Sequence, residues 1–402
     1  MKKLRVNLTG TKKAMKKIVI AIALCVLCLA SCIKDEAKNK ECDIESVWIE
    51  GEEYEQYFYQ KTDMYKDVSS TETNIVFYVR SLISMSTAIP LDFKITSGAT
   101  VYPASGSLQD FTKGPVTYTV TSEDGQWKRT YNVTFSEVPL PVLKLGFEHV
   151  ETVQEKTMLG GVNEMHIFYE QPADNEPDYC WATSNSGSAL TMADSKPEDF
   201  PVYSTPEGKV GRGVCLNTQS AGLMGEFMKK PIAAGSMFLG KFVIDYVLSD
   251  ALKATQFGVP VSKEPVRITG WYKYKPGEKF TDKDMKEYPD RKDEASIYAV
   301  FYRNTDDTGA SYILDGHAVE DLDKLLDNPQ VYKVARVASL PATDTWTQWE
   351  MFFEGSDAPD EFVENQGCNL ALVFSSSKYG AQFEGAIGST LYIDEVEVSY
   401  EE

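Results

Sequence analysis

Residues 265–275 read Pro265-Val-Arg-Ile-Thr-Gly-Trp-Tyr-Lys-Tyr-Lys275, and their side chains alternate between two kinds. One face of this stretch carries Val266, Ile268, Gly270, Tyr272 and Tyr274. The opposite face carries Arg267, Thr269, Trp271, Lys273 and Lys275. A period of two, rich in β-branched and aromatic residues, is typical of a half-buried β-strand. We therefore predict a strand whose first face packs into a hydrophobic core.

Similar patterns continue from residue 142 to residue 402, and evidence for helices is thin. Strands are predicted at 142–147, 213–216, 265–274, 295–302, 330–337, 347–353, 369–374 and 390–399. One or two helical turns are predicted at 319–326. Such a composition indicates one large β-sandwich of jelly-roll type over residues 142–402, and the whole chain is predicted to be all-β.

A smaller β domain is predicted at residues 44–138. Residues 116–121 and 127–135 alternate in the same way, and the turn dipeptide Asp124-Gly125 lies between them, which is a hairpin signal. Short strands joined by turns over about 90 residues indicate an immunoglobulin-like sandwich. Two prolines within residues 137–141 predict an extended linker between the domains.

The charge of the chain excludes some classes of partner. The sequence holds 40 Lys and Arg residues and 60 Asp and Glu residues, for a net charge of −20. The seven basic residues before Cys32 are accompanied by no acid, so cleavage at Cys32 leaves 33 bases, 60 acids and a net charge of −27. Because phosphate contacts need clustered cations, we expect no nucleic-acid partner. Docking on an anionic membrane through a basic patch is excluded for the same reason.

The N-terminus reads as a lipoprotein signal peptide at residues 1–31. Two lysines precede an apolar run of about 13 residues, which is too short to span a bilayer. The run ends in Leu29-Ala30-Ser31-Cys32. This resembles a bacterial lipobox, in which the thiol of Cys32 receives lipid. The alternatives are a plain secretory signal with an incidental cysteine, and a true start at Met15.

Residues 32–43 are polar and charged, as in a flexible tether. Ile33-Lys34-Asp35-Glu36 resembles the export tag that sends Bacteroidetes lipoproteins to the outer face of the outer membrane. We therefore expect a lipid-anchored protein of the outer membrane that is exposed at the cell surface. The alternative is an ordinary charged tether.

Four cysteines follow Cys32 in the sequence: Cys42, Cys180, Cys215 and Cys368. Their wide spacing fits neither a disulfide framework nor a CxxC metal site. Cys215 stands in an apolar run, which favours a buried free thiol. The sequence does not choose among the possible pairings of the four.

Several blocks in the second domain carry a family resemblance. They are Trp181-Ala-Thr-Ser-Asn-Ser-Gly187, residues 233–242, residues 269–277, Ile297-Tyr-Ala-Val-Phe-Tyr302, Val373-Phe-Ser-Ser-Ser-Lys378 and residues 383–394. In this order they resemble the putative carbohydrate metabolism domain family of Bacteroidetes lipoproteins. The resemblance implies a jelly-roll-like sandwich behind an immunoglobulin-like module, and a link to glycans that is sometimes phrased as putative glycoside hydrolase. It implies no catalytic set.

Familiar catalytic motifs are absent from the sequence, which holds no HExxH, GxSxG or P-loop. The three histidines are His149, His166 and His317, and none has a second ligand at helical or hairpin spacing. A zinc site is therefore not expected.

The polar face of residues 265–275 suits a sugar. A sugar ring offers an apolar C–H face to stack on Trp271, and its hydroxyls accept hydrogen bonds from Arg267 and Lys273. The alternative is that Trp271 caps the edge of the core. Trp181 is a second candidate for stacking on sugars, and its alternative is a core position beside Cys180.

Paired carboxylates are the requirement for catalysis, because glycoside cleavage generally needs two acids about 5–10 Å apart. The candidates are Asp293, Glu294, Glu384 and Asp394, and a hydrolase is expected to draw its acids from Asp293, Glu384 and Asp394. Alternation places Asp394 with Val396 and Val398 on an apolar face, where a carboxylate needs a partner. The partner is either a hydrogen-bond donor or a structural calcium ion, since jelly-roll glycan-binding modules often place such an Asp on their last strand. No other cofactor is expected.

Three functions are consistent with these observations. The first is a surface-anchored lipoprotein that binds a polysaccharide or oligosaccharide during glycan capture or utilisation. The second is a glycoside hydrolase that uses paired carboxylates. The third is an adhesin or fimbria-like structural lipoprotein, which would exchange a strand with a neighbour.

Overall fold

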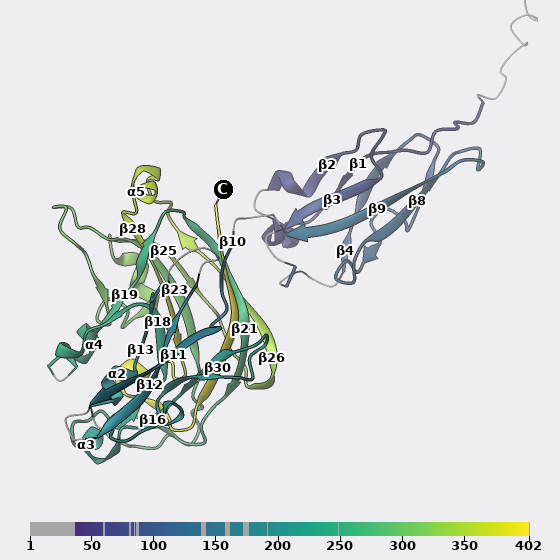
Figure 1. The fold of residues 1–402 in the computed structure, drawn as a ribbon. Helices are drawn as coiled ribbons and strands as arrows, with labels where there is room; N and C mark the ends of the chain where they lie inside the picture. Colours follow the sequence, from purple (N-terminus) through teal and green to yellow (C-terminus); the bar gives the residue numbers. More distant parts are fainter. Residues whose placement is uncertain are drawn as a thin grey trace, which may run out of the picture. The chain divides into compact units, whose positions relative to one another are not determined.

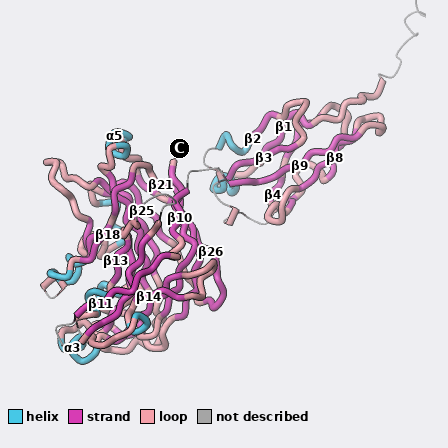
Figure 2. Tube along the Cα trace, in the orientation of Figure 1, coloured by secondary structure: helices cyan, strands magenta, loops and turns pink. Residues whose placement is uncertain are grey.

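The computed structural model describes residues 37–58, 61–79, 82–83, 85, 88–137, 142–156, 161–171, 177–190, 192–247 and 249–401. The signal segment and Cys32 lie outside these residues. The chain forms two compact units, Met1–Pro139 and Leu140–Glu402, and strands dominate each of them (Figures 1 and 2). This confirms the all-β prediction. None of the helices in the described part of the chain is both long and apolar enough to cross a membrane.

The first unit is an immunoglobulin-like sandwich. One sheet has the order β2 (Tyr65–Asp67), β1 (Ile44–Trp48), β5 (Asp92–Ile95). The other has the order β3 (Asn74–Val79), β9 (Lys128–Glu137), β8 (Val116–Thr121), β6 (Thr100–Tyr102). The smaller elements are the ladder of β4 (Ile89–Pro90) with β7 (Leu108–Gln109) and the 3-10 helices η1 (Glu52–Tyr57) and η2 (Lys61–Met64). Strand β3 runs parallel to β9, whereas β8 and β9 form the predicted antiparallel hairpin.

The core of the first unit follows the predicted alternation on β9. Tyr131, Val133 and Phe135 are buried, and they pack with Tyr118 of β8 and residues of the other sheet. The hairpin turns at Gly125, whose φ of 73° favours glycine. Trp127 lies at this turn and is 56% exposed, so it does not extend the buried face.

The second unit is a jelly-roll-like sandwich of two larger sheets. The six-stranded sheet has the order β14 (Val202–Thr205), β15 (Gly213–Asn217), β30 (Thr390–Tyr400), β21 (Pro265–Lys275), β26 (Thr343–Phe352), and β10 (Val142–Leu145) also pairs with β30. The nine-stranded sheet has the order β24 (Leu314–Asp315), β19 (Thr255–Phe257), β18 (Ser236–Phe242), β28 (Cys368–Ser375), β23 (Ser296–Arg303), β25 (Val331–Arg336), β27 (Glu354–Gly355). Two further strands join it, β13 (Trp181–Thr183) on β18 and β20 (Val259–Val261) on β28.

The remaining elements of the second unit are short. Three two-stranded ladders pair β11 (His149–Lys156) with β12 (Val162–Tyr169), β16 (Gln219–Ser220) with β17 (Ile232–Ala233), and β22 (Phe280–Thr281) with β29 (Gly385–Ala386). The helices are α2 (Asn185–Ser188), α3 (Gly222–Phe227), α4 (Ala251–Ala254), α5 (Asp360–Glu364), and the 3-10 turns η3 (Pro197–Asp199), η4 (Ile244–Tyr246), η5 (Leu322–Asp327) and η6 (Gly380–Gln382). The turns predicted at 319–326 therefore appear as η5.

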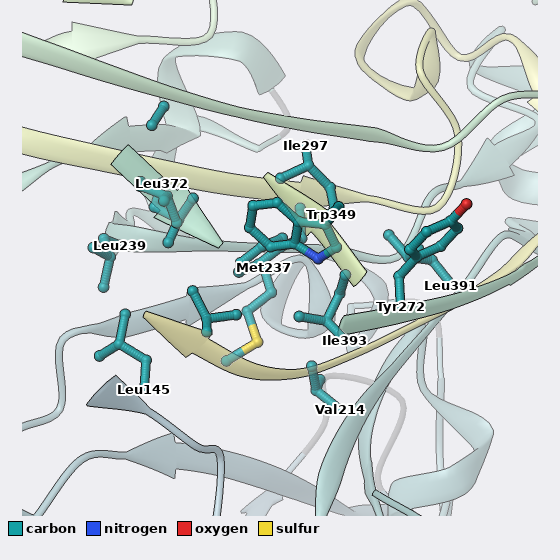
Figure 3. Close-up of a cluster of buried hydrophobic side chains, with 14 of the residues drawn as sticks. Leu145, Val214, Met237, Leu239, Tyr272, Ile297, Trp349, Leu372, Leu391 and Ile393 are labelled. Atoms are coloured by element: carbon teal, nitrogen blue, oxygen red, sulfur yellow. The ribbon is translucent and has the colours of Figure 1, made fainter. Parts of the chain in front are cut away.

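The main core lies between the two larger sheets. Figure 3 shows side chains of both sheets converging around Trp349, among them Tyr272, Ile393, Met237 and Leu372. Trp349 faces Gly270 across the β21–β26 ladder, and a Cβ at Gly270 would lie 2.6 Å from the indole. A larger residue at position 270 therefore has no room. The predicted core face of residues 265–275 is confirmed.

Strand β30 contains a bulge that changes the predicted alternation. Thr269 of β21 pairs with Glu397, but Trp271 pairs with Asp394, so β30 holds one extra residue over this interval. Glu395 has a φ of 48° at this point. The bulge reverses the side-chain parity. Val396 therefore enters the core, whereas Asp394 lies on the outer face of the sheet, and its predicted position on the apolar face is wrong.

Trp181 is a core residue of the second unit. It is 6% exposed and packs against Phe147 and Phe374. Its indole N–H donates to Oε1 of Glu170 at 2.9 Å. Burial raises the pKa of Glu170 to about 7, although the Trp181 N–H and backbone donors act in the opposite direction.

Glu170 predicts a pH-dependent stability for the second unit. A carboxyl whose pKa is raised by folding favours the folded state when it is protonated, so stability is lost as the pH rises through about 4.5 to 7. We expect Glu170→Gln to remove about 1–3 kcal/mol of this pH-dependent loss, since the amide oxygen still accepts from Trp181 without ionising. Urea unfolding of the chain from residue 33 to residue 402 at pH 5 and pH 8 measures this change. An unchanged difference between the two pH values in the variant would contradict the assignment.

Candidate functional site

A pocket of about 1110 Å³ opens at one end of the nine-stranded sheet. Four neighbouring strands meet there, because β18 and β23 begin at this end and β28 and β25 finish at it. Further walls come from segments within 184–192, 219–234, 242–257, 274–276, 316–323, 337–342 and 376–383. Drug-sized ligands occupy pockets of about 300–1,000 Å³. The pocket is therefore large enough for a ligand of several rings.

A row of serines crosses the end of this sheet in the pocket. Ser375 of β28 is paired with Ser236 of β18 on one side and with Ser296 of β23 on the other. All three line the pocket and are partly exposed. Each hydroxyl both donates and accepts a hydrogen bond, as a sugar hydroxyl does. The row therefore offers matched partners to a ligand rich in hydroxyl groups.

Aromatic side chains provide the apolar part of the pocket. Tyr298 and Phe257 belong to the sheet and are buried, whereas Tyr379 is 38% exposed at the rim. The Arg291 guanidinium lies 4.5 Å from the Tyr379 ring centroid, and the Lys230 ammonium lies 5.6 Å from that of Phe383. Rings beside hydroxyl groups are the combination that sugars require, since their C–H faces stack and their hydroxyls hydrogen-bond.

Asp293 is the most constrained charged residue of the pocket and is 3% exposed. Its Oδ2 accepts from the hydroxyls of Ser377 at 2.5 Å and Ser389 at 2.7 Å, and from the backbone N–H of Ala386 at 2.8 Å. Its Oδ1 accepts from the N–H of Glu294 at 2.9 Å. Burial raises the pKa of Asp293, although these donors favour the charged form. The carboxylate thus has neutral partners only.

The hydrogen bonds of Asp293 extend into a buried polar network. The hydroxyl of Thr218 lies 2.6 Å from that of Ser377 and 2.7 Å from that of Ser376. Ser376 in turn accepts from the N–H of Gly235. The network joins residues as far apart in sequence as Thr218 and Ser376, and two of its members, Asp293 and Ser377, line the pocket. It therefore fixes the walls relative to one another.

The second predicted catalytic acid, Glu384, lies close to this network in sequence but has a different partner. It follows η6, and its Oε2 lies 3.4 Å from the Arg291 guanidinium. The guanidinium also lies 3.9 Å from the Phe280 ring centroid, so this side chain is held on two sides. Glu384 is partly exposed and does not line the pocket.

Asp394, the third acid, lies on the outer face of the other sheet. Its Oδ2 accepts from the N–H groups of Lys209 and Val210, and its Oδ1 accepts from that of Glu395. Burial raises its pKa to about 6. Of the two predicted partners, the structure shows hydrogen-bond donors. The predicted pairing of Asp394 with Asp293 or Glu384 in one cleft is not seen.

The calcium ion suggested for Asp394 has no set of ligands at this position. Calcium takes six to eight oxygens. In the described ranges, the group of three acidic side chains whose ligand atoms lie within 4.8 Å of one another is Glu264, Asp357 and Glu401, and it does not include Asp394. The Lys333 ammonium binds both Glu264 and Asp357 there, so a cation of the protein already neutralises this group.

The face predicted around Trp271 is present and is occupied by the chain's own lysines. The Lys209 ammonium lies 4.2 Å from the Trp271 ring centroid. Lys273 lies 4.8 Å from each of the ring centroids of Trp346 and Tyr392. Such contacts are worth about 0.5–2 kcal/mol each. Arg267 is only 9% exposed, so it has little surface to offer a ligand.

Trp181 occupies the core position that was its alternative. Its ring is covered by Phe147 and Phe374, and no free face is left for a sugar. The structure therefore places Trp181 at its alternative, core position, on a strand that pairs with β18.

Comparisons with known proteins give the family. Residues 146–399 match the model described as Putative carbohydrate metabolism domain, and residues 58–135 match the one described as SGBP, N-terminal. The chain belongs to the putative carbohydrate metabolism domain family. Membership gives it a carbohydrate-related role.

Two crystal structures are similar to this chain over nearly all of their own length. A putative glycoside hydrolase from Bacteroides thetaiotaomicron is 32% identical, with 92% of this chain and 99% of that one covered and a TM-score of 0.57. One from Bacteroides vulgatus is 34% identical, with coverages of 64% and 98% and a TM-score of 0.58. No curated protein matches.

The family blocks converge on the pocket. Each of the six blocks that carry the resemblance supplies at least one lining residue: Ser184, Ser236, Tyr274, Tyr298, Ser375 and Phe383 are examples. The sequence of these blocks indicates the family but does not predict that they share one site, because serines at strand ends carry no periodic signal. The run Ser375-Ser376-Ser377 was the available clue.

Asp293 predicts a large structural effect. Asp293→Ala leaves four donors without their acceptor, and we expect a loss of about 2–4 kcal/mol in the free energy of unfolding of the second unit. The matched control is Asp344→Ala at an exposed position, with a loss of about 0.5 kcal/mol or less. Urea unfolding of the mature chain measures both. Equal effects of the two variants would show that the network does not hold the pocket together.

Proposed function

We propose that the chain is a surface-anchored lipoprotein that binds glycans in the pocket of its second unit. The observation that carries this proposal is the convergence of all six family blocks on one pocket, which joins a serine row to aromatic rings. The carbohydrate-related role of the family supplies the ligand class. The match of residues 58–135 to the SGBP N-terminal model lies in the first unit, outside the pocket.

The partners and positions of the three predicted catalytic acids favour binding over hydrolysis. The four hydrogen bonds of Asp293 occupy both of its oxygens, Glu384 is paired with Arg291, and Asp394 lies on the other sheet. Hydrolysis remains the second candidate because both relatives carry the description putative glycoside hydrolase. Two exposed acids of the pocket, Glu294 and Glu320, are the residues to test for it.

Strand exchange of the adhesin kind finds less support. The last long strand, β30, is paired with β15 and β10 along one edge and with β21 along the other. A strand in this position is part of the core of its own sheet, and donating it would expose Ile393 and Val398.

Glycan binding is tested with the mature chain on a panel of polysaccharides, followed by calorimetry with oligosaccharides of those that bind. We expect Tyr379→Ala to weaken binding about tenfold or more, since aromatic contacts contribute about 1–3 kcal/mol. The matched control is Tyr179→Ala, an exposed tyrosine of the same unit outside the pocket. Trp271→Ala tests the alternative site on the outer face of the six-stranded sheet. If Trp271→Ala weakens binding and Tyr379→Ala does not, the site lies on the outer face of the six-stranded sheet.

The same samples test for hydrolysis. We expect no release of reducing ends from any glycan that binds. Release that is lost in Glu294→Gln or Glu320→Gln would establish the hydrolase alternative instead.

Lipid anchoring is tested in cells. We expect Cys32→Ser to abolish labelling by a fatty-acid analogue and to release the chain from the outer membrane fraction, because Cys32 is the proposed lipidated residue. Cys28→Ser, four residues earlier, is the control that retains both properties. Protease shaving of intact cells checks surface exposure, and a protected chain would contradict it.

A further inference from the structure

The charges that line the pocket are numerous but balanced. Four bases and five acids contribute: Lys230, Lys292, Arg336, Lys378, Asp293, Glu294, Glu320, Asp321 and Asp323. A site that binds a carboxylate or sulfate group needs cations whose charge is not already neutralised. The partners of the four bases therefore decide whether the pocket can hold an anionic ligand.

Most of these bases already have a partner. Lys378 lies 3.5 Å from Oε2 of Glu294, and Arg336 forms an ion pair with Asp323. Lys230 donates to the carbonyl oxygen of Val247 at 3.3 Å and lies over the Phe383 ring. Lys292 is exposed beside Asp293. An anionic ligand would therefore have to break an ion pair to use Lys378 or Arg336, whereas Lys230 and Lys292 are not paired with an acid among the described residues.

The buried acid of the pocket points to the same conclusion. Asp293 accepts from hydroxyl and backbone N–H groups, and in the part of the chain that the structure describes no basic side chain forms an ion pair with it. A second negative charge brought into the pocket meets this one in surroundings of low dielectric, where like charges repel strongly. The excess of acids over the whole chain adds a repulsion at longer range.

The uncharged partners are abundant in comparison. Eight serines line the pocket: Ser184, Ser188, Ser220, Ser236, Ser296, Ser339, Ser375 and Ser377. Hydroxyl groups of a neutral sugar exchange hydrogen bonds with such side chains without the desolvation cost of a charge.

We propose that the pocket selects uncharged glycans and rejects those that carry carboxylate or sulfate groups. This rests on the proposed function, because it names the class of glycan that the same pocket binds. The selectivity follows mainly from the buried acid Asp293, whose hydrogen-bond donors are neutral, and is supported by the ion pairs that hold two of the four cations.

The test uses pairs of polymers that differ only in charge. The pairs are methyl-esterified and de-esterified homogalacturonan, dextran and dextran sulfate, and hydroxyethyl and carboxymethyl cellulose, together with neutral glycans from the binding panel and their oxidised, carboxylated derivatives. The mature chain is titrated with each at low and high salt. We expect the neutral member of any pair that binds to bind at least about tenfold more tightly at low salt, and the ratio to shrink as salt screens the repulsion.

Variants locate the effect in the pocket. Glu294→Gln leaves Lys378 without its partner, and we expect the ratio of neutral to anionic affinity to fall at least several-fold. Glu354→Gln removes the same charge at an exposed position of β27 outside the pocket and is expected to leave the ratio unchanged.

Two results overturn the inference, and they are distinguishable. If the charged member of a pair binds as tightly as the neutral one, or if Glu294→Gln and Glu354→Gln have the same ratio, the selectivity is wrong while glycan binding stands. If no neutral or charged glycan binds at all, the proposed function fails and the inference fails with it.

Discussion

The buried carboxylate of Asp293 is the interaction on which the pocket depends. A carboxylate at this depth is tolerable only when its oxygens are fully hydrogen-bonded, and four donors from three separate segments meet this need. The same bonds fix the segments after β28 and β29 beside the start of β23. Thr218 is connected to this network by its hydrogen bond with Ser377, and Gly235 by its hydrogen bond to Ser376. The cost of burying one charge is thus offset by a network that gives several loops a single arrangement.

The sheets supply the frame for this network. The inner faces of the two sheets bury Trp349, Ile393 and Leu372 in the main core, so the strands cannot slide without exposing apolar surface. The outer face of the nine-stranded sheet carries a second core that includes Tyr298 and Val373, two residues that also reach the pocket. The pocket therefore lies where well-packed strands end. The pairing of these strands places the three serines of the row side by side.

The sequence predicted what depends on local alternation and failed where long-range contacts decide. The strands at 265–274 and 295–302 and the hairpin around Gly125 followed from period two and turn chemistry. Strand β18 was missed because it is buried on both faces and does not alternate. The parity of Asp394 failed at the bulge of Glu395, and Trp181 was misplaced because its covering partners, Phe147 and Phe374, are distant in sequence. Of the candidate residues named from the sequence, Asp293 and Glu294 line the pocket.

The proposed glycan site lies among the serine row, Tyr379 and the hydrogen-bond network of Asp293. Hydrogen–deuterium exchange of the mature chain, with and without a saturating neutral oligosaccharide, tests it most directly because it reports on all surfaces at once. We expect added protection at residues 292–298 and 375–383. Protection confined to residues 269–273 and 343–348, around Trp271 and Trp346, would contradict it.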